Sequence, residues 1–378
     1  MEAQAILRAI EKRREWFQRT LRQLVEQESP SEDRAAVNAA LELVISLAQE
    51  HKAHTKRHRQ REFGDVLEVK FGSVRSTQKP VLLLGHLDTV WSLGTLKQMP
   101  WREAQGRYWG PGVLDMKAGV VMALTALAVL REMKLSRPVT LLLNSDEEVG
   151  SPISRAITEQ LALDSSAVFV LEPAQGLAYK TARKGVGLYH VEVEGVGAHS
   201  GVDFERGHSA VLELAKQIQT VSNFTDLKRK LTVNCGIIAG GTRSNVVPSY
   251  AHTEVDVRIA KASDASYVEK LFRKLKVSDP YCKLSVTGGI NRPPMERKSG
   301  TIALFKKARA IAGELGFVLD EAATGGGSDG NFTAALGVPT LDGMGAVGEG
   351  AHALHESVVI EHLMPRTALL AAMIARVG

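Results

Sequence analysis

The sequence contains only two cysteines, Cys235 and Cys282, among 378 residues. Two thiols are too few for a disulfide scaffold or a cysteine-rich zinc site, so we expect both to be reduced. Aromatic residues make up only 5% of the chain, which disfavours a base-stacking surface for nucleic acid. Lysine and arginine number 47 against 42 acidic residues, leaving a net charge of +5. That excess is too small over this length to indicate a polyanionic partner.

The sequence also lacks a long apolar run. The longest, residues 118–130, is shorter than the about 20 residues that cross a bilayer, and residues 1–17 have the pattern of an amphipathic helix rather than a secretory signal. We therefore expect a cytoplasmic protein with neither a membrane nor a nucleic-acid partner. The dense basic stretch at residues 51–61 favours a solvated segment after a helix, because no aromatic residue interrupts it.

The remaining composition, 44% hydrophobic and 24% charged, is that of a globular protein. Domains usually hold roughly 100–200 residues, so two domains are expected. Residues 1–50 are predicted to form two helices. From residue 65 onward, apolar strands alternate with helices, and these strands are predicted at residues 66–71, 81–85, 139–144 and 167–171. Such alternation predicts an α/β domain with a parallel sheet covered on both faces.

The pattern changes after residue 181. Residues 187–196 alternate between polar and apolar side chains, as a half-exposed strand does, and similar strands and helices follow. This predicts a small α+β domain with one open sheet face, inserted into the first domain, with residues 291–300 as the linker back. We therefore expect one domain at residues 1–182 and 294–378 and a second at residues 183–293.

Histidines and carboxylates follow the predicted strands where these end. They are His86, Asp88, Glu147, Glu148 and Glu172, joined by Asp115 in a glycine-rich loop and by the histidines of residues 350–356. Ligands of an open α/β sheet gather beyond the carboxyl ends of its strands. Imidazole and carboxylate together suit Zn²⁺ or a similar divalent ion. Because so many carboxylates cannot all stay ionised in one cleft without cations, the pattern indicates two metal ions.

The spacing of these residues divides their roles. Residues 86 and 88 point to the same side of a strand, so Asp88 is expected to accept the second ring N–H of His86 and fix its tautomer. Glu147 and Glu148 are adjacent and cannot point the same way. One can bind a metal while the other acts as a base toward water. A single His-x-Asp sequence is usually a surface feature, and a single Glu-Glu pair usually begins a helix. The occurrence of both at the ends of predicted strands indicates a site.

The sequence resembles the M20 family of cocatalytic zinc metallopeptidases, which includes glutamate carboxypeptidase, acetylornithine deacetylase and succinyl-diaminopimelate desuccinylase. The matching segments are GHLDTVW (85–91), WGPGVLDMKAG (109–119), NSDEEVGS (144–151), LEPA (171–174), GVGAHSG (195–201), GGTRSNVVP (240–248), DVRIA (256–260), TGGGSDGNF (324–332) and AHALHE (351–356). The resemblance implies a three-layer α/β/α di-zinc domain at residues 1–182 and 294–378, with an inserted α+β lid and dimerisation domain at residues 183–293.

The resemblance also implies two zinc ions per chain, for which Co²⁺ or Mn²⁺ can substitute. Their ligands are His86, Asp115, Glu148, Glu172 and His355. Asp115 bridges both ions, and the Asp115–Met116 peptide is typically cis in this family. Glu147 matches the general base, and Asp88 the residue that clamps the imidazole of His86.

The inserted domain matches the family's lid. His199 resembles a lid histidine that helps stabilise the oxyanion, although a surface position in a glycine-rich turn is the alternative for such a residue. Asn245 and Arg258 match residues that hold the substrate's carboxylate. Gly326, Gly327 and Ser328 resemble a backbone cradle beside the substrate. Homodimerisation through the lid domain is expected.

The implied activity is hydrolysis of an amide by zinc-bound hydroxide, with Glu147 as general base. The closest similarity in motif text is to the glutamate carboxypeptidase branch, so the expected substrate is a small peptide or N-acyl amino acid from which a C-terminal amino acid, glutamate first, is released. An N-acyl amino acid deacylase, such as acetylornithine deacetylase or succinyl-diaminopimelate desuccinylase, remains the alternative enzyme. A non-catalytic metal-binding scaffold is the alternative of another class.

Overall fold

The computed structural model describes residues 2–72, 78–135 and 137–377. The chain divides into two compact units. The first comprises Met1–Ala182, Arg297–Thr324 and Ser328–Gly378, and the second comprises Arg183–Glu296 and Gly325–Gly327. Compared with the expected boundaries, residues 294–296 and 325–327 join the second unit. Met295 exchanges backbone hydrogen bonds with Arg183 at 3.0 and 3.1 Å, which ties the returning chain to that unit.

Three helices, rather than the expected two, form the N-terminal segment. They are α1 (Ala3–Glu11), α2 (Arg14–Glu26) and α3 (Arg34–Glu50). The first helical pattern is interrupted at Arg13, whose φ and ψ of −104° and 9° are not helical. Helix α3 begins at a cap in which the Asp33 carboxylate accepts the N–H groups of Ala35 and Ala36.

The main sheet of the first unit has six strands, in the order β1-β2-β6-β3-β7-β16. Their bounds are β1 His54–His58, β2 Val66–Phe71, β6 Val139–Asn144, β3 Val81–His86, β7 Ala167–Val170 and β16 Thr340–Leu341. Strands β6, β3, β7 and β16 are parallel, whereas β2 and β1 add an antiparallel pair at the edge. The expected all-parallel sheet is therefore correct only for the inner strands, and the basic stretch expected as a solvated segment contains strand β1.

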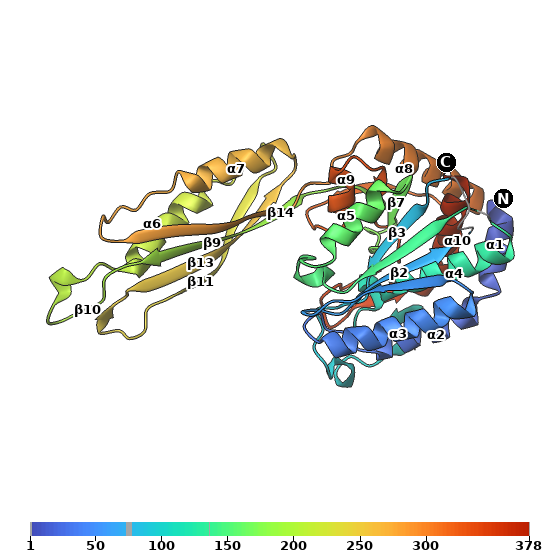
Figure 1. Ribbon diagram of the computed structural model, residues 1–378, viewed down its shortest axis with the longest axis horizontal. Coiled ribbons are helices and arrows are strands. Elements are labelled where there is room, and N and C mark those ends of the chain that lie inside the picture. The colour runs from blue at the N-terminus through green and yellow to red at the C-terminus, as the bar shows by residue number, and fades with distance from the viewer. Residues whose placement is uncertain (1, 73–77, 136, 378) are drawn as a thin grey trace. The chain divides into compact units, whose positions relative to one another are not determined.

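Helices cover both faces of this sheet (Figure 1). On one face, Leu83 packs with α1, α4 and α10 in one apolar core, while Leu82 and Leu84 of the same strand pack with α5 in a second core. These layers confirm the predicted α/β class. The helices of the first unit beyond α3 are α4 Ala118–Glu132, α5 Arg155–Leu163, α8 Ser299–Leu315, α9 Gly330–Ala335 and α10 Ile360–Arg376.

Helix α4 lies at the centre of the first unit. The segment Val113–Glu132 is long and apolar enough for a membrane span, but 94% of its most apolar window is buried in the protein, as in the core helix of a globular domain. Gly119 lets the helix approach the end of β7, because a Cβ at that position would lie 2.1 Å from the Leu171 carbonyl oxygen. Helix α4 is thereby held against the chain that leads to Glu172.

The first unit also contains several short elements. They are η1 Thr95–Lys97, β4 Arg102–Ala104, β5 Arg107–Trp109, η2 Val113–Lys117, η3 Glu147–Val149, β8 Tyr179–Arg183, β15 Glu321–Thr324, β17 Gly348–Glu349 and β18 Ser357–Val359. Strand β18 joins β17 to β5 in a small antiparallel sheet, so the turn at residues 350–356 is anchored beside the loop that follows β5. The Asp115–Met116 peptide inside η2 is cis, as the resemblance implies.

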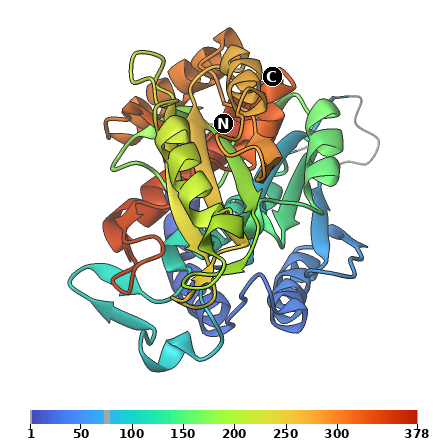
Figure 2. The same cartoon turned by 90° about the vertical axis from the view of Figure 1, so that its left-hand side faces the viewer.

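The second unit contains a four-stranded antiparallel sheet in the order β11-β13-β9-β14 (Figure 1), and Figure 2 shows the same unit turned toward the viewer. Its elements are β9 Gly185–Glu194, β10 Ala198–His199, η4 Phe204–Arg206, α6 Ala210–Ser222, β11 Thr232–Gly240, β12 Val246–Val247, β13 Tyr250–Ile259, α7 Ser263–Arg273 and β14 Lys283–Arg292. Alternate residues of β13, from Ala251 to Ile259, are buried in a core shared with α6 and α7. This arrangement agrees with the α+β expectation for the inserted segment.

Candidate metal centre

Four of the predicted side chains come from the carboxyl ends of the parallel strands. His86 is the last residue of β3, Glu147 and Glu148 lie in η3 directly after β6, and Glu172 follows β7. Asp115 lies in η2, where its φ and ψ of −113° and 95° turn the chain away from helical geometry before α4 begins. Strand topology alone therefore gathers residues that are far apart along the chain.

The imidazole of His86 is buried, and its two nitrogens have different partners. Its Nδ1 lies 2.9 Å from the backbone carbonyl oxygen of Asp88 and 3.4 Å from the carboxylate Oδ1 of the same residue. Its Nε2 faces Asp115 Oδ1 at 3.3 Å and Glu172 Oε1 at 3.7 Å. A proton on Nδ1, held by Asp88, leaves the Nε2 lone pair directed at the carboxylates, which is the tautomer a metal ligand needs.

The second histidine of the cluster is His352, not the expected His355. Its Nε2 lies 3.2 Å from Glu148 Oε2 and 3.5 Å from Asp115 Oδ2. His355 is exposed, and its ring Cδ2 lies 2.8 Å from the position that a Cβ would take on Gly350. The turn that brings the chain into β18 directs residue 352 to the carboxylates, so the assignment of His355 as a ligand is corrected to His352.

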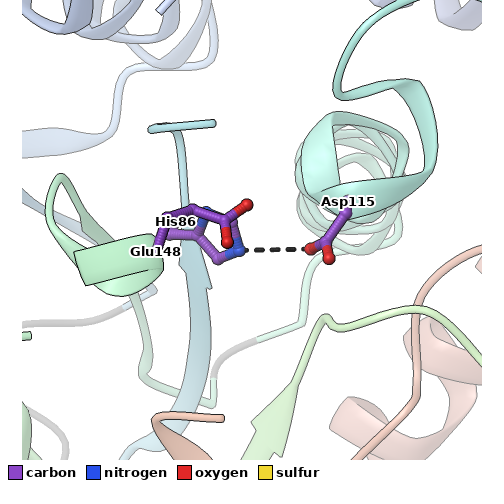
Figure 3. Close-up of side chains that lie close together, drawn as sticks. All are labelled: His86, Asp115 and Glu148. Carbon is purple, nitrogen blue, oxygen red and sulfur yellow. Dashed lines mark ion pairs between the residues drawn. The ribbon is translucent and has the colours of Figure 1, made fainter. Parts of the chain in front are cut away.

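Asp115 is shared between two histidines. Its Oδ1 faces His86, as Figure 3 shows, and its Oδ2 faces His352. Two ligand atoms that are each about 2.0–2.1 Å from a tetrahedral zinc ion are roughly 3.3 Å apart. The four separations between histidine nitrogen and carboxylate oxygen in this cluster lie between 3.2 and 3.7 Å. Two half-sites follow: His86, Asp115 and Glu172 form one, and His352, Asp115 and Glu148 form the other.

Unsatisfied acceptors support a cation at this place. Among the described residues, Asp115 Oδ1 and Glu148 Oε1 are buried oxygens without a hydrogen-bond partner. The ligand atoms of His86, Asp115 and Glu148 lie within 4.8 Å of one another, as do those of His86, Glu147 and Glu172. A buried carboxylate oxygen without a donor is costly unless a positive charge faces it. The residues present therefore fit divalent metal ions.

The pKa shifts of His86, His352 and Asp115 also indicate that positive charge is favoured in this cluster. Burial acts to lower the pKa of His86, but the facing carboxylates of Asp115, Asp88 and Glu172 outweigh it and raise that pKa well above the usual value. Hydrogen bonds with Asp115 and Glu148 raise the pKa of His352 to about 10. Burial opposes ionisation of Asp115, yet the two histidines hold its pKa below the usual range. Protons on the imidazoles thus take the place that cations would occupy.

The carboxylate of Asp88 positions the turn that follows β6. It is fully buried and accepts the backbone N–H groups of Glu147 at 3.3 Å and Glu148 at 3.1 Å. Ser31 Oγ donates to its Oδ2 at 2.8 Å. The sequence indicates a clamp on His86, but the closest acceptor of that imidazole is the Asp88 backbone. Ser31 is a partner of Asp88 that the sequence does not reveal, because its position before a helix is equally typical of a helix cap.

Two expected lid residues are neighbours within the second unit. His199 lies in β10, which pairs with β12 directly after Asn245, and the Ser200 N–H donates to the Asn245 carbonyl at 3.0 Å. Both His199 and Asn245 are exposed. The N–H of Gly201 donates to His199 Nδ1 at 3.1 Å, which leaves Nε2 to carry the proton when the ring is neutral.

Arg258 already has a carboxylate partner. Its Nη2 lies 2.8 Å from Asp256 Oδ2, its Nε bonds to both oxygens of Asp256, and its Nη1 lies 3.5 Å from the Gly325 carbonyl. The Arg258 side chain is 30% exposed. A substrate carboxylate at this position therefore has to share the guanidinium with Asp256 or displace it.

The glycine segment is held through its carbonyls. Arg183 Nη1 donates to the Gly326 carbonyl at 3.2 Å and to the Gly327 carbonyl at 3.0 Å. Ser328 is buried, its hydroxyl donates to Asp342 at 2.6 Å, and its N–H donates to Asn331 Oδ1 at 3.0 Å. The expected backbone cradle does not extend to Ser328, because both its donors are used within the first unit.

The chain belongs to Peptidase family M20/M25/M40, whose sequence profile matches residues 82–376. It is accordingly a hydrolytic enzyme of the metallopeptidase class, and the resemblance carried by the motifs is confirmed. Members of this family use metal ions, in agreement with the donor set described above.

Two relatives differ, by their names, in the amide bond that they cleave. The chain is 31% identical to carboxypeptidase G2 of Pseudomonas sp. (strain RS-16) over 303 residues, which cover 78% of this chain and 72% of that protein. It is 28% identical to acetylornithine deacetylase of Myxococcus xanthus over 224 residues, covering 56% of this chain and 58% of the deacetylase.

Solved structures share the fold over nearly the whole chain. Aminopeptidase PepT of Bacillus cereus superposes with a TM-score of 0.77 at 19% identity, covering 96% of this chain and 98% of that one. The M20 metallo-carboxypeptidase Sso-CP2 of Sulfolobus solfataricus gives 0.76 at 17% identity, covering 95% and 98%. At these identities the likeness concerns the fold alone.

Proposed function

We propose that this protein is a di-zinc hydrolase that releases a C-terminal amino acid from small peptides or N-acyl amino acids. The observation that carries the proposal is the carboxylate of Asp115, whose two oxygens face His86 and His352 respectively. The same Nε2 atom of each histidine also faces a second carboxylate, that of Glu172 for His86 and that of Glu148 for His352. This set of nitrogen and oxygen donors suits two ions of the zinc type that share one bridging ligand.

The chain's own residues divide the work of hydrolysis. When bound, a divalent cation polarises the amide carbonyl and lowers the pKa of coordinated water. Glu147, whose carboxylate lies with His86 and Glu172, takes a proton from the attacking water and passes it to the leaving nitrogen. Asp88 fixes the turn that carries Glu147. His199 of the second unit donates a hydrogen bond to the carbonyl oxygen as it gains negative charge.

The similarity to carboxypeptidase G2 supports a substrate with a free carboxylate beside the scissile amide. Arg258 is the proposed anchor, together with Asn245, because a guanidinium binds a carboxylate through two parallel hydrogen bonds. Its present partner, Asp256, lies two residues away on the same strand, and the proposed substrate carboxylate shares the guanidinium with Asp256 or displaces it. Glutamate is the leading candidate for the released residue.

Deacylation of an N-acyl amino acid is the second candidate, supported by the 28% identity to acetylornithine deacetylase. The same site serves both reactions, because each is the hydrolysis of an amide next to a carboxylate. A non-catalytic metal scaffold is disfavoured by Glu147. A scaffold needs only metal ligands, and it has no use for an additional carboxylate that lies beside the ligands and is not itself a ligand.

Paired substrates test the proposal. N-acyl amino acids and dipeptides are offered to the zinc-loaded enzyme as free acids and as the matching C-terminal amides. We expect the acids to be cleaved and the amides to show a KM raised at least about tenfold, in keeping with the loss of a charge-assisted pair. Arg258→Ala removes the difference between acid and amide, whereas Arg258→Lys restores only part of it. Equal cleavage of acids and amides contradicts carboxylate anchoring, and preference for N-acetylornithine selects the deacylase.

We further propose that the protein forms a homodimer through its second unit. Strand β11 is an edge strand that carries Ile237 and Ile238, 53% and 61% exposed, and Leu212 on α6 is 66% exposed. An open edge lined with apolar side chains favours pairing across a two-fold axis. Sedimentation of the native chain is expected to give a dimer that Ile238→Lys dissociates and Val318→Lys, 73% exposed in the first unit, does not. A monomeric native chain rules the dimer out.

A further inference from the structure

Glu356 is a fully buried carboxylate that receives four N–H groups. Its Oε1 accepts the backbone N–H groups of Leu114 at 2.8 Å and Asp115 at 3.0 Å. Its Oε2 accepts the backbone N–H of Gly112 at 2.9 Å and the indole N–H of Trp91 at 2.8 Å. One side chain thus satisfies three backbone donors of the loop that presents the bridging carboxylate.

That loop needs an outside acceptor. Gly112 has a φ of +70°, and Asp115 departs from helical geometry, so their N–H groups have no regular secondary-structure partners. The side chain of Asp115 leaves the backbone at the residue whose N–H Glu356 holds. The direction of the bridging carboxylate is therefore set by the position of Glu356.

The same short turn carries a metal-site residue. His352 lies four residues before Glu356, and the turn between them is closed by hydrogen bonds from Ala353 N to the Gly350 carbonyl at 2.8 Å and from Glu356 N to the Ala353 carbonyl at 2.9 Å. His352 meets the carboxylate of Asp115 at 3.5 Å, while Glu356 meets its N–H. The turn therefore holds Asp115 at two points.

We propose that Glu356 is a positioning residue that sets the distance between Asp115 and His352, and thereby the affinity of the half-site formed with Glu148. The inference rests on the proposed two-metal function. Both half-sites use Asp115, which Glu356 holds by its N–H. The first takes its other ligands, His86 and Glu172, from the ends of strands β3 and β7, whereas the second takes His352 from the same turn as Glu356. Loss of Glu356 therefore weakens the second metal ion more than the first.

Replacement by glutamine isolates the effect of the carboxylate from that of its size. A glutamine amide keeps one acceptor oxygen but presents an NH₂ group where the other oxygen stood. Whichever way the amide is turned, two of the four N–H donors face another donor. Glu356→Asp keeps both oxygens on a side chain that is shorter by one methylene, and serves as the conservative variant.

Metal titration of the metal-free protein tests the inference. Zn²⁺ is added in competition with a chromophoric chelator, and Co²⁺ is used in parallel to record the absorption spectrum of each bound ion. For Glu356→Gln we expect the first ion to bind within threefold of native affinity, the second to bind at least tenfold more weakly, and the Co²⁺ spectrum of the second ion to change. Glu356→Asp is expected to recover part of the affinity.

Glu213→Gln is the matched control. Glu213 is also buried and accepts the backbone N–H groups of Ser278 at 2.9 Å and Asp279 at 3.2 Å, together with the amide of Gln217 at 2.7 Å, all in the second unit. Both Glu213→Gln and Glu356→Gln are expected to lower the melting temperature. Only Glu213→Gln is expected to leave both metal affinities unchanged.

The outcomes separate this inference from the function on which it rests. A native protein that binds fewer than two ions overturns the two-metal proposal itself. A native protein that binds two, with a Glu356→Gln variant that binds both at native affinity or loses both equally, overturns the positioning role alone. If Glu356→Gln does not fold, the same comparison is made with Glu356→Asp, and equal affinities for both ions there overturn the role as well.

Discussion

His352 has a left-handed backbone conformation, with a φ of +63°. Non-glycine residues rarely adopt this region, and such conformations cluster at functional sites where the surrounding structure enforces them. At this residue the enforcing structure is the turn between β17 and β18, whose ends are fixed by their pairing. The conformation turns an imidazole that is half exposed toward two acidic partners.

Alanine substitution of His352 and of His355, one at a time, distinguishes the roles of the two histidines. We expect His352→Ala to reduce bound zinc from two ions to about one per chain and to abolish most activity, because Glu148 loses its partner ligand. His355→Ala, in the same turn, is expected to keep both ions. Elemental analysis after dialysis against buffered zinc measures the ratio. Zinc lost from His355→Ala but kept in His352→Ala would make His355 the ligand instead.

Removal of the base separates binding from chemistry. Glu147→Gln is expected to keep the metal content of the native protein while turnover falls by roughly 10²–10⁴-fold, the usual contribution of a general base. Glu159→Gln, on α5 and paired with Arg155 on the same helix, serves as the control that loses neither. Metal analysis and initial rates on the same preparations give both quantities. Native turnover in Glu147→Gln disproves the role of Glu147 as base.

Residue types at strand ends are sufficient to predict most of the cluster. His86, Asp115, Glu148 and Glu172 are brought together as expected. The choice between His352 and His355 depends on the path of the turn at residues 350–356, which composition does not encode. The acceptor of the His86 N–H escapes prediction for a related reason: whether a carbonyl or a carboxylate lies closer is a matter of tenths of an ångström.

At the scale of elements, apolar runs are the most reliable signal. The inner strands β3, β6 and β7 and the helix α4 are predictable because they are mostly apolar, as strands and helices buried on all sides are. Strand β1 is not, because its sequence, HTKRH, is basic and typical of a solvated segment. Charged side chains are common on edge strands, where they prevent further strands from pairing.

The edge strand β1 and its neighbour β2 are joined by a buried carboxylate whose ionisation stabilises them. Glu68 is 2% exposed, with Lys70 Nζ at 2.7 Å and His58 Nε2 at 2.9 Å. Burial acts to raise its pKa, but the bonds to Lys70 and His58 outweigh burial and lower the pKa from its usual value of 4.5. Because the folded pKa is depressed, its contribution is fully present above pH 4.5 and is lost as the pH falls through the lower folded value.

Glu68→Gln is therefore expected to destabilise the first unit by about 1 kcal/mol at pH 7, a value discounted because Lys70 is exposed. The difference from native should shrink as the pH is lowered below 4.5. Urea unfolding of the metal-free protein at several pH values measures it, with the exposed Glu62→Gln as control. A difference that stays constant between neutral and acidic pH contradicts the assignment.

At the scale of the whole molecule, the two units have separate apolar cores. The change from apolar strands to alternating strands near residue 182 locates the first boundary in the sequence. Residues 325–327 cannot be placed in the same way, because they join the second unit through the guanidinium of Arg183, a contact between segments that are distant along the chain. Contacts of this kind leave no periodic signal in the sequence.

Metal removal should act on one unit alone, because every residue of the proposed metal centre belongs to the first unit. A ligand present at about 100 times its dissociation constant stabilises the folded form by about 2.7 kcal/mol. The two proposed ions therefore contribute about 5.4 kcal/mol, and for a domain of this size class that corresponds to roughly 11–22 °C in melting temperature. Chelation is therefore expected to lower the transition of the first unit by this amount and to leave that of the second unchanged.

Scanning calorimetry with and without a chelator resolves the two transitions, and Ile259→Ala, a fully buried position in the core of the second unit, identifies which transition belongs to that unit. Such a truncation leaves a cavity and costs about 2–5 kcal/mol. Ile259→Ala should lower the transition temperature of the second unit. The response of the first unit's transition to the chelator should be the same as in the native protein. A chelator that shifts both transitions equally would mean that the ions stabilise the chain as one body, and a chelator without effect would mean that the carboxylate cluster binds no metal.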